Sequence, residues 1–192
     1  LYFIENRGQL DHKVRFYVKT SGQTLYFTDE GIVFDLFRGK PGPKKTQELR
    51  ESTPKGKTER LAFALAFDNA RKGISIAGVE KQGARVNYLL GNEAGWKRDI
   101  PTYKGIVYKG VYRGIDLKIR GNSRAIKYDF IVNPGADPGN ILLSYNGIEG
   151  LGVNEKGELI IETAFGGLKE TKPYLYQKIE GKTVEVSGGF RV

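Results

Sequence analysis

The sequence contains no cysteine, which excludes disulfide bonds, thiolate metal sites and cysteine nucleophiles. It also contains no methionine, so we expect the chain to be a processed or excised piece of a longer protein. The single histidine, His12, cannot build the common zinc sites, and any catalytic triad would have to use it. His12 lies in a polar stretch, which indicates a solvated or capping side chain rather than a catalytic one.

Long apolar runs are absent as well. No stretch approaches the roughly 18 residues that a membrane-spanning helix requires, and no signal-peptide pattern is present. If the protein is exported, we expect its signal peptide to have been removed ahead of Leu1. The remaining composition, 39% hydrophobic and 28% charged over 192 residues, is typical of one globular domain that buries a core without cross-links.

The formal net charge of +9 invites a nucleic-acid-binding interpretation. Most basic residues are spread along the chain, and one segment rich in Pro and Gly holds a further six: Lys40, Lys44, Lys45, Arg50, Lys55 and Lys57. Net charge by itself argues for solubility and loose association, not for specific readout. We therefore expect no specific nucleic-acid partner.

The dominant pattern along the chain is an alternation of apolar and polar residues with period two, which predicts β-strands. Turn residues separate these short runs roughly every 8–12 residues, which favours an all-β, antiparallel, β-sandwich-like fold. No sustained helical period is found, which argues against βαβ folds. The expected strands are 14–19, 24–28, 32–37, 61–67, 74–79, 85–90, 102–108, 115–120, 126–132, 141–145, 150–153, 159–163, 174–179, 183–186 and 189–192.

One segment interrupts the strand pattern. Residues 38–60 contain three prolines and only one large aliphatic residue, Leu49, so we expect a long mobile loop there. The whole chain, 1–192, is interpreted as a single all-β module. A division into two packed β-subdomains near 91–100 is the alternative.

A Tyr-basic-Gly-aliphatic pattern occurs three times between Tyr103 and Ile115. Its spacing is irregular and far shorter than the repeat length of solenoid proteins. We therefore interpret the pattern as strands with bulges rather than as a repeat architecture.

A β-hairpin predicted over 115–130 carries the clearest candidate for chemistry. In the register that we predict, Asp116 lies opposite Asp129 and Lys118 lies opposite Lys127 on the polar face. Two opposed carboxylates could bind a cation, or act as the acid and nucleophile of a retaining glycosidase, whose carboxyl groups lie roughly 5–5.5 Å apart. We favour the simpler interpretation, in which the two lysines neutralise both aspartates in an exposed charge ladder.

Two further groups are candidates for ligand binding. Trp96, the only tryptophan, and Tyr103 could form an exposed platform beside basic residues and stack on sugar rings or bases. We favour the alternative, in which Trp96 anchors the core. Asp137, in the oxygen-rich loop 133–140, could bind calcium, although a turn-stabilising role is the interpretation that we favour.

Several segments occur together in an order that is similar to a known family. They are Glu5–Gln9, Asn87–Asn92, Trp96, Ile100–Tyr103, Val111–Leu117, Tyr128–Phe130, Pro134–Pro138 and Lys172–Tyr174 with Gln177. In this combination they resemble the uncharacterised N-terminal domain that precedes SBBP-type β-propeller repeats in large bacterial cell-surface proteins. The resemblance implies export and a position ahead of propeller or other adhesive repeats, and it implies no reaction.

These observations together predict a non-catalytic structural or recognition module of a secreted or cell-surface bacterial protein, with no cofactor. The expected partners are the downstream domains of the same protein, together with glycans or cell-envelope components. The alternatives are a carbohydrate-binding module that uses Trp96 and Tyr103, and a carbohydrate-active enzyme that uses Asp116 and Asp129.

Overall fold

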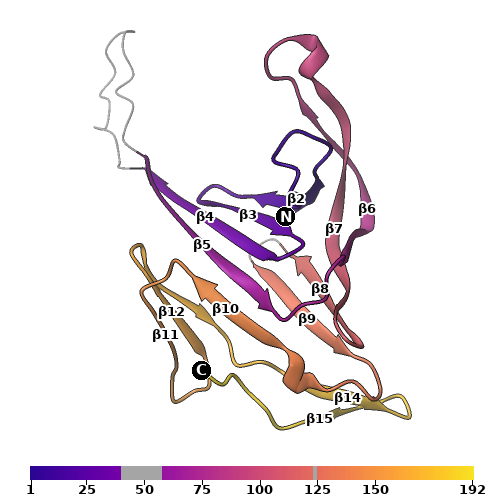
Figure 1. Cartoon of the computed structure of the whole chain (residues 1–192), viewed down its shortest axis with the longest axis vertical. Helices are drawn as coiled ribbons and strands as arrows, with labels where there is room; N and C mark the ends of the chain where they lie inside the picture. The colour runs from indigo at the N-terminus through magenta and orange to yellow at the C-terminus, as the bar shows by residue number, and fades with distance from the viewer. Residues whose placement is uncertain (40–57, 123–124) are drawn as a thin grey trace. The chain divides into compact units, whose positions relative to one another are not determined.

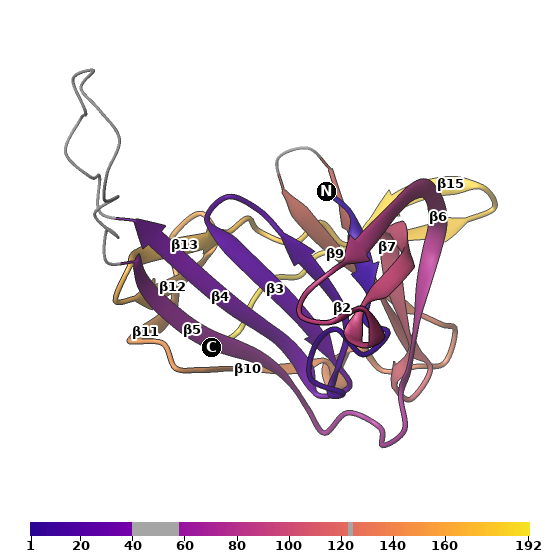
Figure 2. The same cartoon turned by 90° about the horizontal axis from the view of Figure 1, so that it is seen from above.

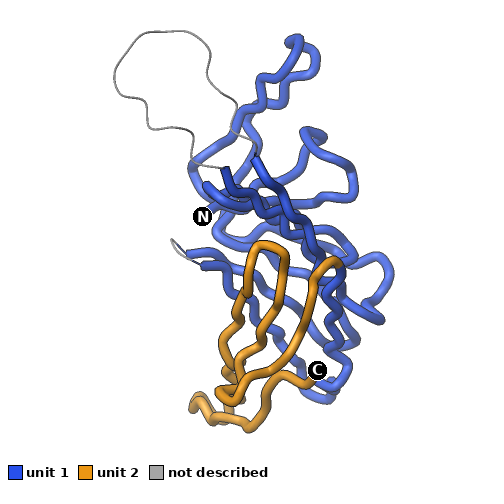
Figure 3. The backbone as a smooth tube through the Cα atoms, turned by 90° about the vertical axis from the view of Figure 1, so that its left-hand side faces the viewer, with its two compact units in different colours: residues 1–146 blue, residues 147–192 orange. Residues whose placement is uncertain are grey.

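The computed structural model describes residues 1–39, 58–122 and 125–192, and almost every regular element in them is a β-strand (Figure 1). All described strand pairs are antiparallel, so the prediction of an all-β antiparallel fold is confirmed. The chain divides into two compact units, residues 1–146 and 147–192 (Figure 3). The division suggested near 91–100 is therefore misplaced, because those residues lie within a hairpin of the first unit.

The first unit contains one ten-stranded sheet, which is strongly curled (Figures 1 and 2). Its order is β10-β5-β4-β3-β2-β1-β7-β8-β9, with β6 paired to β7. Two short 3-10 helices, η1 (Glu93–Gly95) and η2 (Pro138–Asn140), lie in its connections. The strands are β1 (Phe3–Glu5), β2 (Val14–Lys19), β3 (Gln23–Thr28), β4 (Gly31–Gly39), β5 (Thr58–Asp68), β6 (Ser75–Tyr88), β7 (Lys97–Tyr112), β8 (Ile115–Gly121), β9 (Ile126–Val132) and β10 (Leu142–Asn146).

Alternation along the strands decides which face of the sheet is buried. On β8, for example, Ile115, Leu117 and Ile119 are buried, while the polar residues between them face the other side. Curling lets one sheet cover its own apolar face, and each large apolar side chain buried in this way contributes roughly 1.5–3 kcal/mol. The buried cluster comprises Phe3, Phe16, Val18, Leu25, Phe27, Ile32, Leu65, Phe67, Ile74, Ile106, Tyr108, Val111, Tyr112, Ile115, Leu117 and Ile119.

The three glycines of the Tyr-basic-Gly pattern meet three different backbone requirements. Gly105 packs so closely on β8 that an added Cβ would lie 2.6 Å from the Ile119 carbonyl oxygen. Gly110, with φ +62°, lies where the pairing between β7 and β8 shifts register. Gly114, with φ +71°, forms the turn between these strands. The interpretation as strands with bulges is confirmed.

The Tyr108 hydroxyl is buried in the core without a hydrogen-bond partner among the described residues. Its ring meets that of Phe67 edge-on, with 5.2 Å between centroids, and burial raises the pKa of Tyr108 well above its usual value. An unpaired buried polar group costs about 1–3 kcal/mol, so Tyr108→Phe should raise the free energy of urea-induced unfolding by about 1 kcal/mol. Unchanged or reduced stability would contradict this expectation and indicate a partner such as an internal water.

A second buried tyrosine, Tyr112, has a partner. It is 2% exposed, and its hydroxyl donates to the Leu142 carbonyl oxygen at 2.5 Å. Burial raises the pKa of Tyr112 to about 12. An unfolded tyrosine ionises near pH 10. The stability that protonated Tyr112 contributes to the folded chain is therefore complete below about pH 10 and is lost as pH rises to about 12. Urea unfolding across this window should show that decline. It should be shallower in Tyr112→Phe, and an equally steep decline there would assign the effect to other groups.

Several strand predictions need correction. β4 extends to Gly39 and β5 begins at Thr58, so both ends of the loop expected over 38–60 are paired strand, and residues 40–57 lie outside the described residues. The strands expected over 74–79 and 85–90 are one 14-residue strand, β6, which continues through the bulge between them. Residues 189–192 form no strand.

The second unit consists of two small antiparallel sheets. One contains β11 (Gly150–Val153), β12 (Leu159–Thr163) and β13 (Gly166–Glu170), and the other is the hairpin of β14 (Tyr176–Ile179) and β15 (Lys182–Glu185). Within this unit Leu159 and Ile161 are buried, whereas every residue of β14 and β15 is exposed. Across both units, the described residues include no helix with the length and apolar character to cross a membrane.

Candidate functional site

Asp116 and Asp129 lie on the neighbouring strands β8 and β9, but in a different register from the one predicted. Asp116 pairs with Ile131, and Asp129 pairs with Lys118, so the two aspartates are not opposed. Gly121 stays in the strand because the turn begins one residue later, where the Asn122 side chain accepts from the Ala125 N–H at 2.8 Å. A two-residue shift preserves the side-chain alternation, and the predicted apolar face is therefore retained.

Each of these aspartates has its own cationic partner. Lys109 Nζ and the Gly110 N–H each donate to Asp116 at 2.7 Å, and Arg120 pairs with Asp129. Partial burial acts to raise the pKa of Asp116, but the hydrogen bonds from Lys109 and Gly110 outweigh it and lower the pKa. A general acid needs a raised pKa. This geometry instead suits a carboxylate that holds the bulge at Gly110.

Trp96 and Tyr103 do not form a shared platform. Six residues lie between them in the chain, all of them in β7, and this length of strand corresponds to about 20 Å. The Tyr103 ring packs on Gly78 and meets the Phe16 ring edge-on, with 5.8 Å between centroids. Trp96 is half-buried outside the core cluster, and its indole N–H donates to the Gly91 carbonyl oxygen at 3.2 Å. The prediction that Trp96 anchors the core is therefore wrong, because Trp96 secures a hairpin tip.

Asp137 and His12 occupy local positions in loops. The Asp137 carboxylate caps η2 and accepts from the Gly139 N–H at 2.8 Å, which is the turn-stabilising role favoured for it. His12 is exposed, with Nδ1 3.4 Å from an Asp11 carboxylate oxygen. Among the residues that the structure describes, no three His, Cys, Asp or Glu side chains gather in a group that could hold a metal ion.

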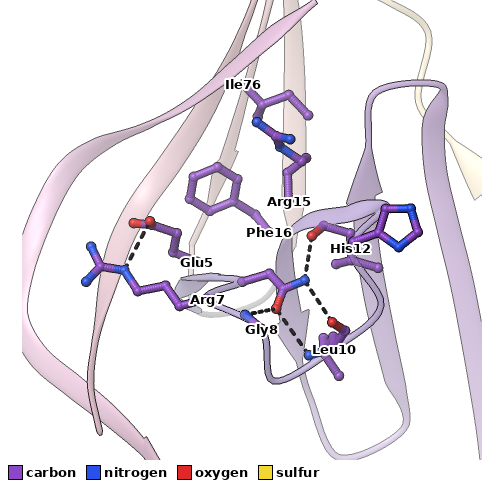
Figure 4. Close-up of a pocket in the computed structure, with 10 residues that line it drawn as sticks. Glu5, Arg7, Gly8, Leu10, His12, Arg15, Phe16 and Ile76 are labelled. Atoms are coloured by element: carbon purple, nitrogen blue, oxygen red, sulfur yellow. Dashed lines mark hydrogen bonds and ion pairs between the residues drawn. The ribbon is translucent and has the colours of Figure 1, made fainter. Parts of the chain in front are cut away.

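A pocket of about 440 Å³ lies where the loop after β1 approaches β2 and β6 (Figure 4). Its charged side chains come from three places: Glu5 ends β1, Arg7 lies in the loop and Arg15 lies in β2. The pocket is lined by Glu5, Asn6, Arg7, Gly8, Leu10, His12, Val14, Arg15, Phe16 and Ile76.

The side chain of Asn6 organises the loop that borders this pocket. Its Nδ2 lies 3.3, 2.8 and 2.7 Å from the carbonyl oxygens of Leu10, Asp11 and Val14. Its Oδ1 accepts from the N–H groups of Gly8 and Leu10, both at 3.1 Å (Figure 4). One amide therefore contacts five backbone groups of the segment between Gly8 and Val14.

Gln9 completes the loop with the same chemistry. Its Nε2 donates to the Glu5 carbonyl oxygen at 2.7 Å, and its Oε1 accepts from the Arg7 N–H at 2.7 Å. Gly8, between Arg7 and Gln9, has φ +92°, a conformation that favours glycine. The segment Glu5–Gln9, which contributed to the family resemblance, is thus a device for building this loop.

The electrostatics of the pocket are mixed. The Glu5 carboxylate accepts from Arg7 Nε at 3.2 Å and, through its other oxygen, from the Tyr103 hydroxyl at 3.0 Å. Burial, together with Glu5, raises the pKa of Tyr103 and keeps it protonated. Glu5 is the only carboxylate among the lining residues, and both of its oxygens are engaged. This arrangement suits the binding of polar groups better than acid–base chemistry.

A contact that the sequence did not predict links β2 to the β6–β7 hairpin. Lys19 Nζ donates to the Tyr88 hydroxyl at 2.6 Å and lies 5.2 Å from the centroid of that ring. Burial opposes ionisation of Tyr88, but hydrogen bonds from Lys19 and Tyr17 outweigh it and lower the pKa of Tyr88. Lys19 and Tyr88 are distant in sequence, so no local pattern could have indicated this contact.

Comparison with known proteins gives a family but no relative of established activity. A family model described as a domain of unknown function (DUF7948) matches residues 3–192. No match was found among curated proteins or among solved structures.

Proposed function

The chain belongs to the DUF7948 family of domains of unknown function, and from this premise we propose that it is a non-catalytic structural or recognition module of a secreted or cell-surface bacterial protein. The proposal rests on one observation. The carboxylates that could take part in chemistry instead make contacts that hold the fold. Asp116 secures a bulge, Asp137 caps a helix, and Glu5 joins a loop to β7.

The ordered motifs support a more specific placement of the domain. Two of them, Glu5–Gln9 and Pro134–Pro138, contain polar side chains that shape loops through backbone contacts. Such residues preserve a scaffold. From the resemblance of the ordered motifs, we propose that the domain precedes SBBP-type propeller repeats in an exported protein. Its partners would be the downstream domains of that protein and components of the cell envelope.

Protease treatment of intact cells of the source bacterium tests the export component. The full-length gene product should carry a signal peptide and downstream repeats, and antibodies against this domain should detect its digestion without lysis. A cytoplasmic enzyme in the same cells, which should survive intact, is the control. Protection of the domain until the cells are lysed would overturn the proposal.

A further inference from the structure

The β6–β7 hairpin extends beyond its neighbours in the sheet as a two-stranded arm (Figure 1). Strand β1 pairs with β7 only at Thr102 and Tyr103, and β8 pairs with β7 from Gly105 onward. Nearer the tip, β7 pairs with β6 alone among the described strands. We refer to residues 82–101 as the arm. The Lys19–Tyr88 hydrogen bond fastens it to β2.

The tip of the arm presents two adjacent apolar side chains to solvent. Leu89 is 51% exposed and Leu90 is 73% exposed. The loop beneath them is well fixed, because the Asn92 side chain accepts from the Gly95 N–H at 3.2 Å and the Trp96 indole donates to the Gly91 carbonyl oxygen. Holding two leucines in water on an ordered tip is unfavourable unless something covers them.

Two basic residues, Lys97 and Arg98, follow the leucines and the tip loop in sequence. The Arg98 guanidinium stacks on the Trp96 ring at 4.8 Å from its centroid and also pairs with Glu93 at 3.0 Å. Lys97, between the two stacked residues in sequence, is partly exposed, and its side chain lies near Gly8 of the loop after β1. The arm carries three cationic residues and two carboxylates, and Lys19 at its base adds a fourth cation.

We propose that the arm tip binds the surface of a bilayer that contains anionic lipids. Leu89 and Leu90 would enter the boundary between headgroups and acyl chains. Trp96 would lie at headgroup level, where tryptophan is enriched, and Lys97 and Arg98 would contact lipid phosphates. A narrow convex tip fits this partner better than a protein surface, because stable protein interfaces bury roughly 800 Å² on each side. The inference goes beyond the proposed function and does not depend on export.

Trp96 supplies a direct test, because it is the only tryptophan in the chain. Phosphatidylcholine vesicles with and without phosphatidylglycerol are titrated into the full chain while tryptophan emission is recorded. Anionic vesicles should shift the emission to shorter wavelength, and brominated lipids should quench it. Binding should weaken as salt increases, and neutral vesicles should bind more weakly.

Variants locate the binding surface. Leu90→Asp should reduce partitioning into anionic vesicles about tenfold or more, and Lys97→Glu should reduce it about fivefold to tenfold. The matched controls are Val192→Asp, which replaces an apolar residue that is 70% exposed, and Lys178→Glu on the exposed strand β14. Both controls should bind as the wild-type chain does. Leu90, Lys178 and Val192 are exposed and Lys97 is partly exposed, so circular dichroism should show native folding in each variant.

Three outcomes would overturn the proposal. The first is an unchanged Trp96 emission in the wild-type chain at vesicle saturation. The second is a loss of partitioning in Val192→Asp equal to that in Leu90→Asp, which would indicate nonspecific adsorption. The third is self-association in sedimentation velocity that Leu90→Asp abolishes, without any vesicle binding, which would assign the tip to a protein contact.

Discussion

Replacing Asn6 by aspartate should lower the free energy of unfolding by about 2–3 kcal/mol, although the two side chains are nearly the same size. The Asn6 Nδ2 group faces three carbonyl oxygens, of which the nearest two lie at 2.7 and 2.8 Å. A carboxylate cannot donate to them and would place negative charge against their partial negative charges. Urea denaturation followed by circular dichroism measures the loss.

The same substitution at Asn92 is the matched control. There the side chain, at the N-cap of η1, accepts a hydrogen bond from the Gly95 N–H. Aspartate caps a helix about as well as asparagine does, so Asn92→Asp should change stability by less than about 0.5 kcal/mol. Equal effects at the two positions would show that the donor role of Asn6 does not hold the loop.

Gly105→Ala should destabilise the fold by about 3 kcal/mol, because the added methyl group has no space. Its Cβ would lie 2.6 Å from the Ile119 carbonyl oxygen and 3.1 Å from the Arg120 side chain. The closer contact is with backbone that is itself paired to Gly105 and Ile106, so relief requires separating β7 from β8. Thermal and urea unfolding should both shift toward lower stability.

Gly83→Ala in β6 controls for the glycine-to-alanine change itself. Nothing lies within 4 Å of a Cβ added at Gly83, and its backbone has no positive φ. Alanine there should be neutral or slightly stabilising, by up to about 1 kcal/mol, because it restricts the unfolded chain. If Gly105→Ala proved as mild as Gly83→Ala, the close packing of β7 on β8 would be disproved.

Alternation along the chain predicts most strands because the rule is local. On β8, the apolar positions Ile115, Leu117 and Ile119 identify the buried face without knowledge of the neighbouring strand. The Tyr-basic-Gly pattern over 103–115 likewise indicated strands with bulges, and Gly110 lies at such an irregularity. By contrast, β1 was missed, because only three of its residues pair and one of them is Glu5.

Register and long-range contacts could not be obtained in this way. The predicted opposition of Asp116 and Asp129 failed because the turn begins at Asn122, and a shift of two residues keeps the same hydrophobic pattern. The loop around Asn6 depends on a side-chain amide reaching carbonyl groups up to eight residues away. The sequence motif marked that segment as unusual but could not say which groups it joined.

The free edge of strand β6 is irregular, and this irregularity limits its pairing with strands of other copies of the domain. Glu80 has φ +55°, and the register shift that follows lies between the charged residues Lys81 and Arg85. A strand from another copy could pair with β6 only along a regular row of N–H and C=O groups. The irregular backbone near Glu80 interrupts that row. At the edge formed by β6, high local density should therefore not extend the sheet from one copy to the next.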